Sequence, residues 1–190
     1  MPIAYYVIDS SIGPDDADFF DAFGAFIDAL EASGLGFEIP TQDESSIQNV
    51  QRWPILGRRG SIAVYDNYDT QIRHIELVGV DDEVLATLTR EALARLPVEG
   101  HDELLLAYQS TPTAKALVKL TLSAPEPIGD AAALLIEAAL ESADDSLRRH
   151  AAYCMGLLAA PRFERLLRAR REIETEPWIT DTIDQALQFY

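Results

Sequence analysis

Apolar and polar positions in the first part of the chain alternate between strand-like and helix-like order. The β-branched and aromatic run 3–10 predicts a strand. After Asp15 or Asp16, which would cap a helix, apolar residues recur at steps of three and four until Gly34. This period predicts a helix with one apolar stripe. The stripe consists of Phe19, Phe23, Phe26, Ile27 and Leu30.

The middle of this part contains a second set of predicted elements. Residues 37–40 predict a short strand, but 41–60 show no clear period, and we expect a long connection there with a helical turn near 45–51. Further predictions are a hairpin with strands at 61–66 and 71–80, a helix over 82–96 and a strand within 102–110. The order β-α-β-β-β-α-β predicts a sheet with helices on one face.

Beyond Thr111 the strand patterns stop and alanine becomes frequent. Five segments with a helical period follow, separated by prolines. They are 111–124, 129–142, 144–159, 160–174 and 176–189. The predicted fold class is therefore α+β, with a mixed α/β sheet domain over residues 1–110 and an antiparallel helical array over residues 111–190.

The stretch "DDSLRRHAAYCMGLLAAPRFERLL", residues 144–167, resembles HEAT-type repeats. The positions that match are Leu147, Arg148, Ala151, Met155 and Gly156. A weaker copy, "EPWITDTIDQAL", follows 32 residues later but lacks the arginine and the glycine. The resemblance implies stacked helix pairs and a role in binding proteins, with the arginine meeting acids such as Asp144 or Asp145. A plain helical bundle is the alternative.

About two repeats do not bury both ends of a stack, because three or more are usually needed. We therefore expect the helical half to be covered by the sheet half or by another chain.

Charge is distributed unevenly along the sequence. The net charge is −17, and residues 1–51 contain ten acids with no lysine or arginine. Residues 144–171 reverse the sign, with seven arginines and three acids. The overall charge disfavours nucleic-acid and anionic-membrane partners, which bind clustered Lys and Arg. The asymmetry predicts two surfaces of opposite sign.

Cysteine content and hydropathy predict a cytoplasmic protein. Cys154 is the single cysteine, so no disulfide forms within the chain, and we expect it to be a buried small residue. Residues 1–11 lack the features of a secretory signal, and no apolar run approaches the length of a membrane span.

Evidence for catalysis or cofactors is slight. The three histidines have no spacing typical of a metal triad, and the acids near 9–21 are better explained as helix-capping residues. No phosphate-binding glycine motif follows a strand. We therefore predict no catalytic residues, no metal and no cofactor. An unrecognised enzyme with a site between the two halves is an alternative, with Asp9, Asp66, His74 and Glu76 as its candidates.

Two groups of residues are candidates for protein recognition. Arginines recur every three residues in 160–174, and a tryptophan lies beside three arginines in 52–59. The candidates are Arg162, Arg165, Arg168 and Arg171 in the first group, and Trp53, Arg58 and Arg59 in the second.

These features predict a non-enzymatic scaffold that recognises another protein through helical and charged surfaces. The alternative is an acidic immunity or inhibitor protein that masks a basic toxin such as a nuclease with its first fifty residues. The oligomeric state is not predicted.

Overall fold

The computed structural model describes residues 3–8, 17–45, 48–57, 60–68, 70–79, 81–125 and 127–190. The chain divides into two compact units, Met1–Gly100 and His101–Tyr190. The first, here called the sheet unit, contains the strands, and the second, the helical unit, contains only helices among its described residues. The fold class is therefore α+β. The division lies ten residues before the predicted boundary at 110, because the segment 101–110 is helical.

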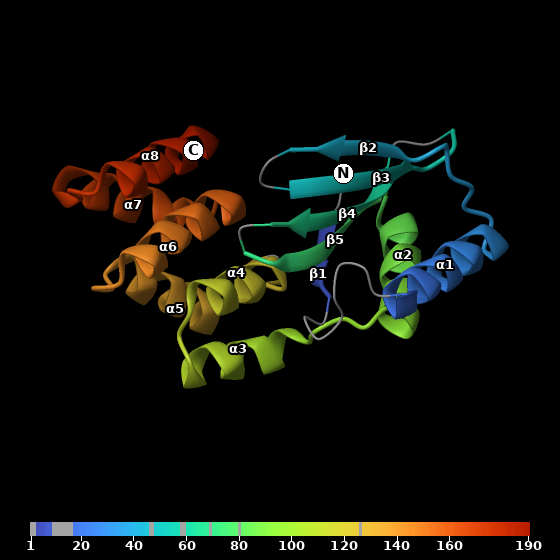
Figure 1. The fold of residues 1–190 in the computed structure, drawn as a ribbon, viewed down its shortest axis with the longest axis horizontal. Helices are drawn as coiled ribbons and strands as arrows, with labels where there is room; N and C mark the ends of the chain where they lie inside the picture. The colour runs from blue at the N-terminus through green and yellow to red at the C-terminus, as the bar shows by residue number, and fades with distance from the viewer. Residues whose placement is uncertain are drawn as a thin grey trace. The chain divides into compact units, whose positions relative to one another are not determined.

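In the described part of the sheet unit, five strands form one sheet in which every pairing is antiparallel. Their order across the sheet is β1-β5-β4-β3-β2, which Figure 1 shows. The strands are β1 (Ile3–Val7), β2 (Thr41–Glu44), β3 (Gln48–Pro54), β4 (Ser61–Asn67) and β5 (Ile72–Val78).

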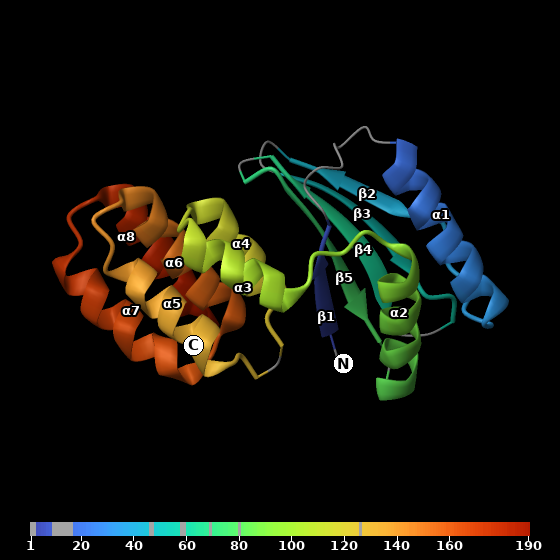
Figure 2. The same cartoon turned by 90° about the horizontal axis from the view of Figure 1, so that it is seen from below.

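Two helices, α1 (Ala17–Ala32) and α2 (Asp82–Arg95), lie on the same face of this sheet (Figure 2). Strand alternation turns one set of apolar residues toward them, and the helical stripes complete the core. The strands contribute Ile62, Val64, Ile75 and Leu77. The helices contribute Phe19, Phe23, Phe26, Leu30, Val84, Leu88 and Ala92. The apolar stripe predicted for α1 is confirmed by the burial of Phe19, Phe23, Phe26 and Leu30.

The chain enters α2 through a tight connection. A Cβ atom at Gly79 would lie 2.7 Å from the backbone nitrogen of Leu85, so only glycine fits there. Asp81 then caps the helix, since its carboxylate accepts a 2.9 Å hydrogen bond from the backbone nitrogen of Val84.

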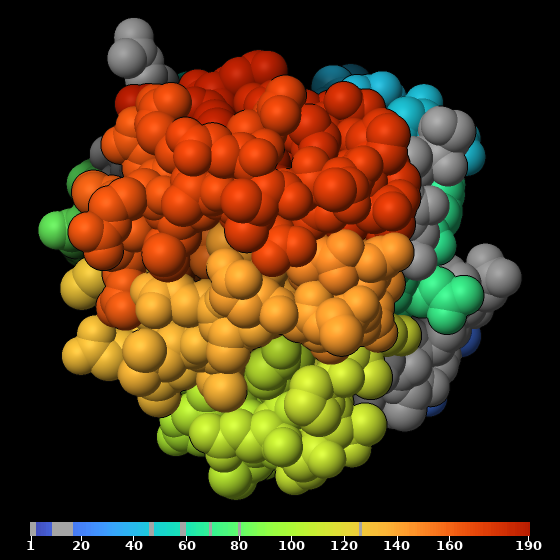
Figure 3. Space-filling model, turned by 90° about the vertical axis from the view of Figure 1, so that its left-hand side faces the viewer, coloured from blue at the N-terminus to red at the C-terminus, as the bar shows by residue number. Residues whose placement is uncertain are grey.

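The described residues of the helical unit form six α-helices, and each one contacts the next along the chain, with only slight contact across the α4–α5 and α6–α7 turns. Alternate helices also meet, α4 with α6 and α6 with α8. Figure 3 shows α3, α5 and α7 as successive bands on one side of this unit. The helices are α3 (His101–Ser110), α4 (Ala114–Leu122), α5 (Asp130–Leu140), α6 (Asp145–Leu158), α7 (Pro161–Ile173) and α8 (Pro177–Ala186).

Helices α6 and α8 run in the same direction at close range. The guanidinium of Arg149 lies 5.6 Å from the ring centre of Trp178 near the two helix starts. Toward the ends, a Cβ at Gly156 would lie 2.8 Å from the Cβ of Ala186. Small residues at this crossing let the backbones approach.

The core of the helical unit also holds the single thiol. Cys154 is fully buried, as expected, and burial raises the pKa of its thiol from 9.0 to about 12.

Three predictions of secondary structure were wrong. Residues 101–110 form α3 rather than a strand: Leu104 and Tyr108, four residues apart, are buried, whereas Leu106 is exposed. The segment 41–54 forms β2 and β3 rather than a connection with a helical turn. Residues 37–40 contain one isolated bridge, from Phe37 to Ile55, rather than a strand.

Candidate functional site

A pocket of 390 Å³ opens in the sheet unit between the start of α1 and the strands β3, β4 and β5. Its size lies within the range of ligand-binding pockets. Its lining consists of five aromatic side chains, one valine and four polar side chains. The residues are Phe19, Phe20, Phe23, Trp53, Val64 and Tyr68, with Asn49, Gln51, Asp66 and Arg73.

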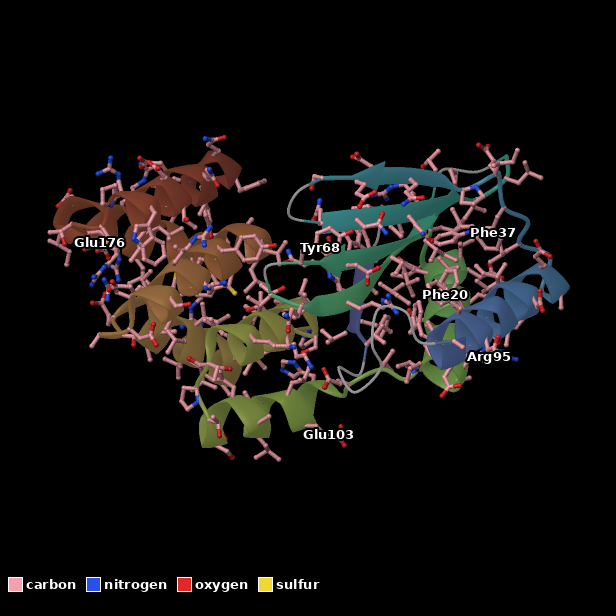
Figure 4. All side chains as sticks on the ribbon, viewed as in Figure 1. Phe20, Phe37, Tyr68, Arg95, Glu103 and Glu176 are labelled. Atoms are coloured by element: carbon pink, nitrogen blue, oxygen red, sulfur yellow. The ribbon has the colours of Figure 1, made fainter. Side chains whose placement is uncertain are left out.

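Strand alternation explains why these residues share one site. Asn49, Gln51 and Trp53 occupy every second position of β3, and Val64 with Asp66 does so in β4. All five point to the face that α1 covers. Figure 4 labels Phe20, which comes from the first turn of α1, and Tyr68, which comes from the turn after β4.

An ion pair lies at the base of the pocket. The Nε atom of Arg73 donates to Oδ1 of Asp66 at 2.6 Å, across the β4–β5 pairing. The Arg73 side chain is only 7% exposed, so its charge needs this carboxylate close by. Its guanidinium also lies 4.2 Å from the ring centre of Phe19, a cation–π distance.

The aromatic residues contact one another around this ion pair. Phe23 is 5.8 Å from Phe19 and 4.7 Å from Trp53, measured between ring centres. Such tilted and offset contacts hold the rings in fixed orientations. By contrast, Phe20 and Tyr68 remain 50% and 46% exposed, so each leaves part of its ring free at the mouth.

The surroundings of the pocket are acidic. The hydroxyl of Tyr68 donates to a carboxylate oxygen of Glu44 at 3.4 Å. Over the whole sheet unit, residues 1–100 contain 18 acids and 6 basic residues, a net charge of −12, whereas residues 101–190 contain 14 acids and 9 basic residues, a net of −5. Most of the negative charge therefore belongs to the unit that carries the pocket.

The opposite face of the sheet carries a separate hydrogen-bonded cluster around Glu76. Its carboxylate accepts from the hydroxyl of Tyr5 at 3.2 Å, from that of Tyr65 at 3.1 Å and from the guanidinium of Arg52 at 3.1 Å. Burial raises the pKa of Tyr65, and the charge of Glu76 adds to this effect. The hydroxyl therefore stays a donor to the carboxylate at neutral pH.

His74 lies on this same face but is poorly placed for acid–base work. Its ring stacks on Tyr65, with ring centres 4.6 Å apart and planes at 5°. Burial lowers its pKa from 6.5 to about 4, so the ring is neutral at pH 7. Among the described residues, His74 makes no hydrogen bond with Glu76, which lies two positions along the same strand. The Glu76 carboxylate instead accepts from Tyr5, Tyr65 and Arg52.

The three described residues of the enzyme alternative, Asp66, His74 and Glu76, do not share one site. Asp66 pairs with Arg73 on the helix-covered face, opposite the face of His74 and Glu76. Asp9 lies outside the described residues. Among the described residues no group of three or more His, Cys, Asp and Glu side chains is arranged to hold a metal ion.

The predicted arginine stripe on α7 is engaged in pairs within the chain. Arg162 bonds to Glu137 at 2.8 Å, and Arg168 bonds to Glu164 at 2.8 Å. Arg171 donates to Asp184 at 2.7 Å, and Arg165 alone of the four makes no ion pair with the residues that the structure describes. The stripe is thus largely neutralised by neighbouring acids.

The second predicted group is only partly described. Trp53 lines the pocket, whereas Arg58 and Arg59 lie outside the described residues. Sequence reasoning missed Phe20, Tyr68 and Arg73 as site residues. The signal for Arg73 was its place in β5 between apolar positions: a cation on the core-facing side of a strand needs an acidic partner.

Comparison with known proteins adds no assignment: no family model, no curated protein and no solved structure matches this chain. In the described part of the chain, no helix combines the length and the apolar character that a bilayer-spanning segment requires.

Proposed function

We propose that this protein is a non-enzymatic, cytoplasmic binding protein that recognises a basic protein partner through the pocket of its sheet unit. The aromatic pocket with its acidic surroundings carries this proposal. Trp53, Phe20 and Tyr68 are residue types that supply binding energy at protein interfaces. The negative charge of the sheet unit would speed encounter with a partner of opposite sign.

The helical unit acts as a scaffold of HEAT-like helix pairs in this proposal. Three observations support it: alternate helices contact each other, α6 and α8 run in the same direction, and Gly156 meets Ala186 at their crossing. Arg148, the arginine of the repeat-like segment, pairs with Asp145 and with Glu174 at the end of α7. Contacts between neighbouring helices of this kind are expected for stacked helix pairs.

The negative charge of the sheet unit favours a positively charged partner. A basic toxin such as a nuclease fits this requirement, and the protein would then serve as its inhibitor. The arginine stripe of α7 is the weaker docking surface, because three of its four members are paired with acids of the same chain.

Affinity capture from a lysate of the host tests the proposal with three full-length baits. They are the wild type, Phe20→Ser in the pocket, and Phe189→Ser, a matched change of another exposed phenylalanine in the helical unit. We expect one basic protein to be captured by the wild type and by Phe189→Ser, to be lost with Phe20→Ser, and to be released above about 0.3 M NaCl, where exposed charges are screened. An acidic partner, or equal capture by all three baits, contradicts the proposal.

The arginine stripe has its own test in the same assay. Arg165→Glu reverses the one stripe arginine without an ion pair among the described residues, so loss of capture with this bait alone would move the docking surface to α7.

A further inference from the structure

We infer that the pocket binds the guanidinium group of an arginine side chain presented by the basic partner. This inference rests on the proposed function and names the chemical group that the pocket takes. Three features of the site support it: the faces of its aromatic rings, the balance of its charges, and its two side-chain amides.

The aromatic walls already hold one guanidinium. That of Arg73 lies 4.2 Å from the ring centre of Phe19 and 5.7 Å from that of Phe20. Ring faces carry negative electrostatic potential and attract cations. Because Phe20 and Tyr68 are about half exposed at the mouth, they offer further ring surface to a second cation.

The charges at the site favour a cation over a neutral or anionic group. Arg73 is neutralised by Asp66 at 2.6 Å, so the resident cation contributes little net positive charge. Glu44, held by Tyr68 at the rim, then leaves a negative charge. An anion would be repelled by this carboxylate and by the acid-rich sheet unit.

The amides favour arginine over lysine. Asn49 and Gln51 line the pocket, and each side-chain amide has an oxygen that can accept hydrogen bonds; that of Asn49 also accepts from Gln42 at 3.2 Å. A guanidinium is planar, stacks on aromatic rings and presents several N–H donors in one plane, whereas a lysine ammonium is a compact, strongly hydrated charge. A flat donor group between rings and amides matches the lining of this site.

The experiment follows the indole N–H signals of the full-length chain by two-dimensional ¹H–¹⁵N NMR during titration with N-acetyl-arginine amide. Trp53 lies in the pocket and Trp178 in the helical unit, so the second signal serves as an internal control, assigned with Trp178→Phe. N-acetyl-citrulline amide is the matched probe, since it has the same shape without the charge.

We expect the arginine probe to shift the Trp53 signal in a saturable way and to leave that of Trp178 in place. Glu44→Gln should weaken this binding about three- to fivefold, as should Phe20→Ser, whereas Phe189→Ser should leave it unchanged. N-acetyl-tyrosine amide is titrated as an uncharged aromatic probe. The inference is overturned if the citrulline probe shifts the Trp53 signal as much as the arginine probe, if only the tyrosine probe shifts it, or if the arginine probe leaves it unchanged.

The two proposals fail separately. If Phe20→Ser abolishes partner capture but the arginine probe leaves Trp53 unmoved, the pocket binds a partner through another group, and only this inference is lost. If the probe binds but no bait captures a basic protein, the arginine site stands and the proposed function is wrong.

Discussion

Among individual residues, Arg148 is hydrogen-bonded to two acids and to two backbone oxygens of the helical unit. Its guanidinium donates to Glu174 at 3.0 Å and to the backbone oxygens of Ser142 and Ala143 at 3.0 and 3.1 Å. A further bond reaches Asp145. The side chains of Arg148 and Glu174 are only 9% and 1% exposed, so each charge depends on the other.

Removing the cation should therefore destabilise the protein strongly. Arg148→Met leaves the Glu174 carboxylate buried with fewer partners, and we expect a loss of about 3 kcal/mol in the free energy of unfolding. Urea denaturation followed by circular dichroism measures it. Arg149→Met, at the exposed neighbouring position, is the control, and its effect should stay within about 0.5 kcal/mol. Equal losses in the two variants would show that the buried pair adds no stability.

The same pair predicts a dependence on pH. Burial acts to raise the pKa of Glu174, but hydrogen bonds from Arg148 and Arg170 outweigh it and lower the pKa from 4.5 to about 2. A carboxyl whose pKa is lower in the folded state stabilises the fold above its unfolded pKa, and this stabilisation is lost as pH falls from about 4.5 toward 2.

We expect Glu174→Gln to be less stable than the wild type at pH 7, and the difference to shrink steadily below pH 4.5. Urea denaturation of both proteins at pH 7, 4.5 and 3 measures the difference directly. Because all other acids titrate in both proteins, the comparison isolates Glu174. A gap that stays constant over this range would mean that the folded carboxyl has an ordinary pKa.

At the level of elements, the crossing of α6 and α8 sets the tightest steric limit in the helical unit. Gly156→Ala places a Cβ 2.8 Å from that of Ala186, and we expect a loss of about 1–3 kcal/mol although alanine favours helices. Gly24→Ala in α1 meets nothing within 4 Å and should instead gain up to about 1 kcal/mol. Thermal unfolding of both variants tests the contrast. A Gly156→Ala variant that is more stable than the wild type would mean that the crossing of α6 and α8 has room for a methyl group.

The elements also show what the sequence could predict and what it could not. Helices with a clear apolar stripe, such as α1, and helices punctuated by proline, such as α7 and α8, match their predicted positions. Strand β2 escaped prediction because all four of its residues are exposed at the edge of the sheet, which leaves no alternating pattern. The leucine run in α3 imitated a strand, since three consecutive apolar residues fit either period.

The candidate site was predictable only in part, for a similar reason. Trp53 stood out by residue type, and the predicted hairpin correctly placed β4 beside β5, but neither the register that sets Arg73 opposite Asp66 nor the pairing of β3 with β4 was predicted. The arginine stripe of α7 was visible by spacing, yet its acidic partners Glu137 and Asp184 come from α5 and α8. The exact pairing between separate elements therefore decided both outcomes.

For the molecule as a whole, the net charge of −17 opposes folding through self-repulsion. We expect the midpoint of thermal unfolding to rise by about 2–4 °C when NaCl is raised from about 20 to about 300 mM, because salt screens exposed charges. A variant with Asp21→Asn, Asp28→Asn and Glu31→Gln on the exposed side of α1 should respond less. A midpoint that falls with salt in the wild type would show that attractive ion pairs dominate instead.

Because Cys154 is buried, its rate of alkylation measures how often the helices of the helical unit separate. A fully buried thiol, whose pKa burial raises to about 12, hardly reacts with alkylating reagents at neutral pH while α6 stays in place. Alkylation therefore has to wait until the helices separate, and its rate in an excess of reagent counts those openings. Since the sequence contains no other cysteine, a time course of mass spectra measures how long the helices stay packed, without any added label.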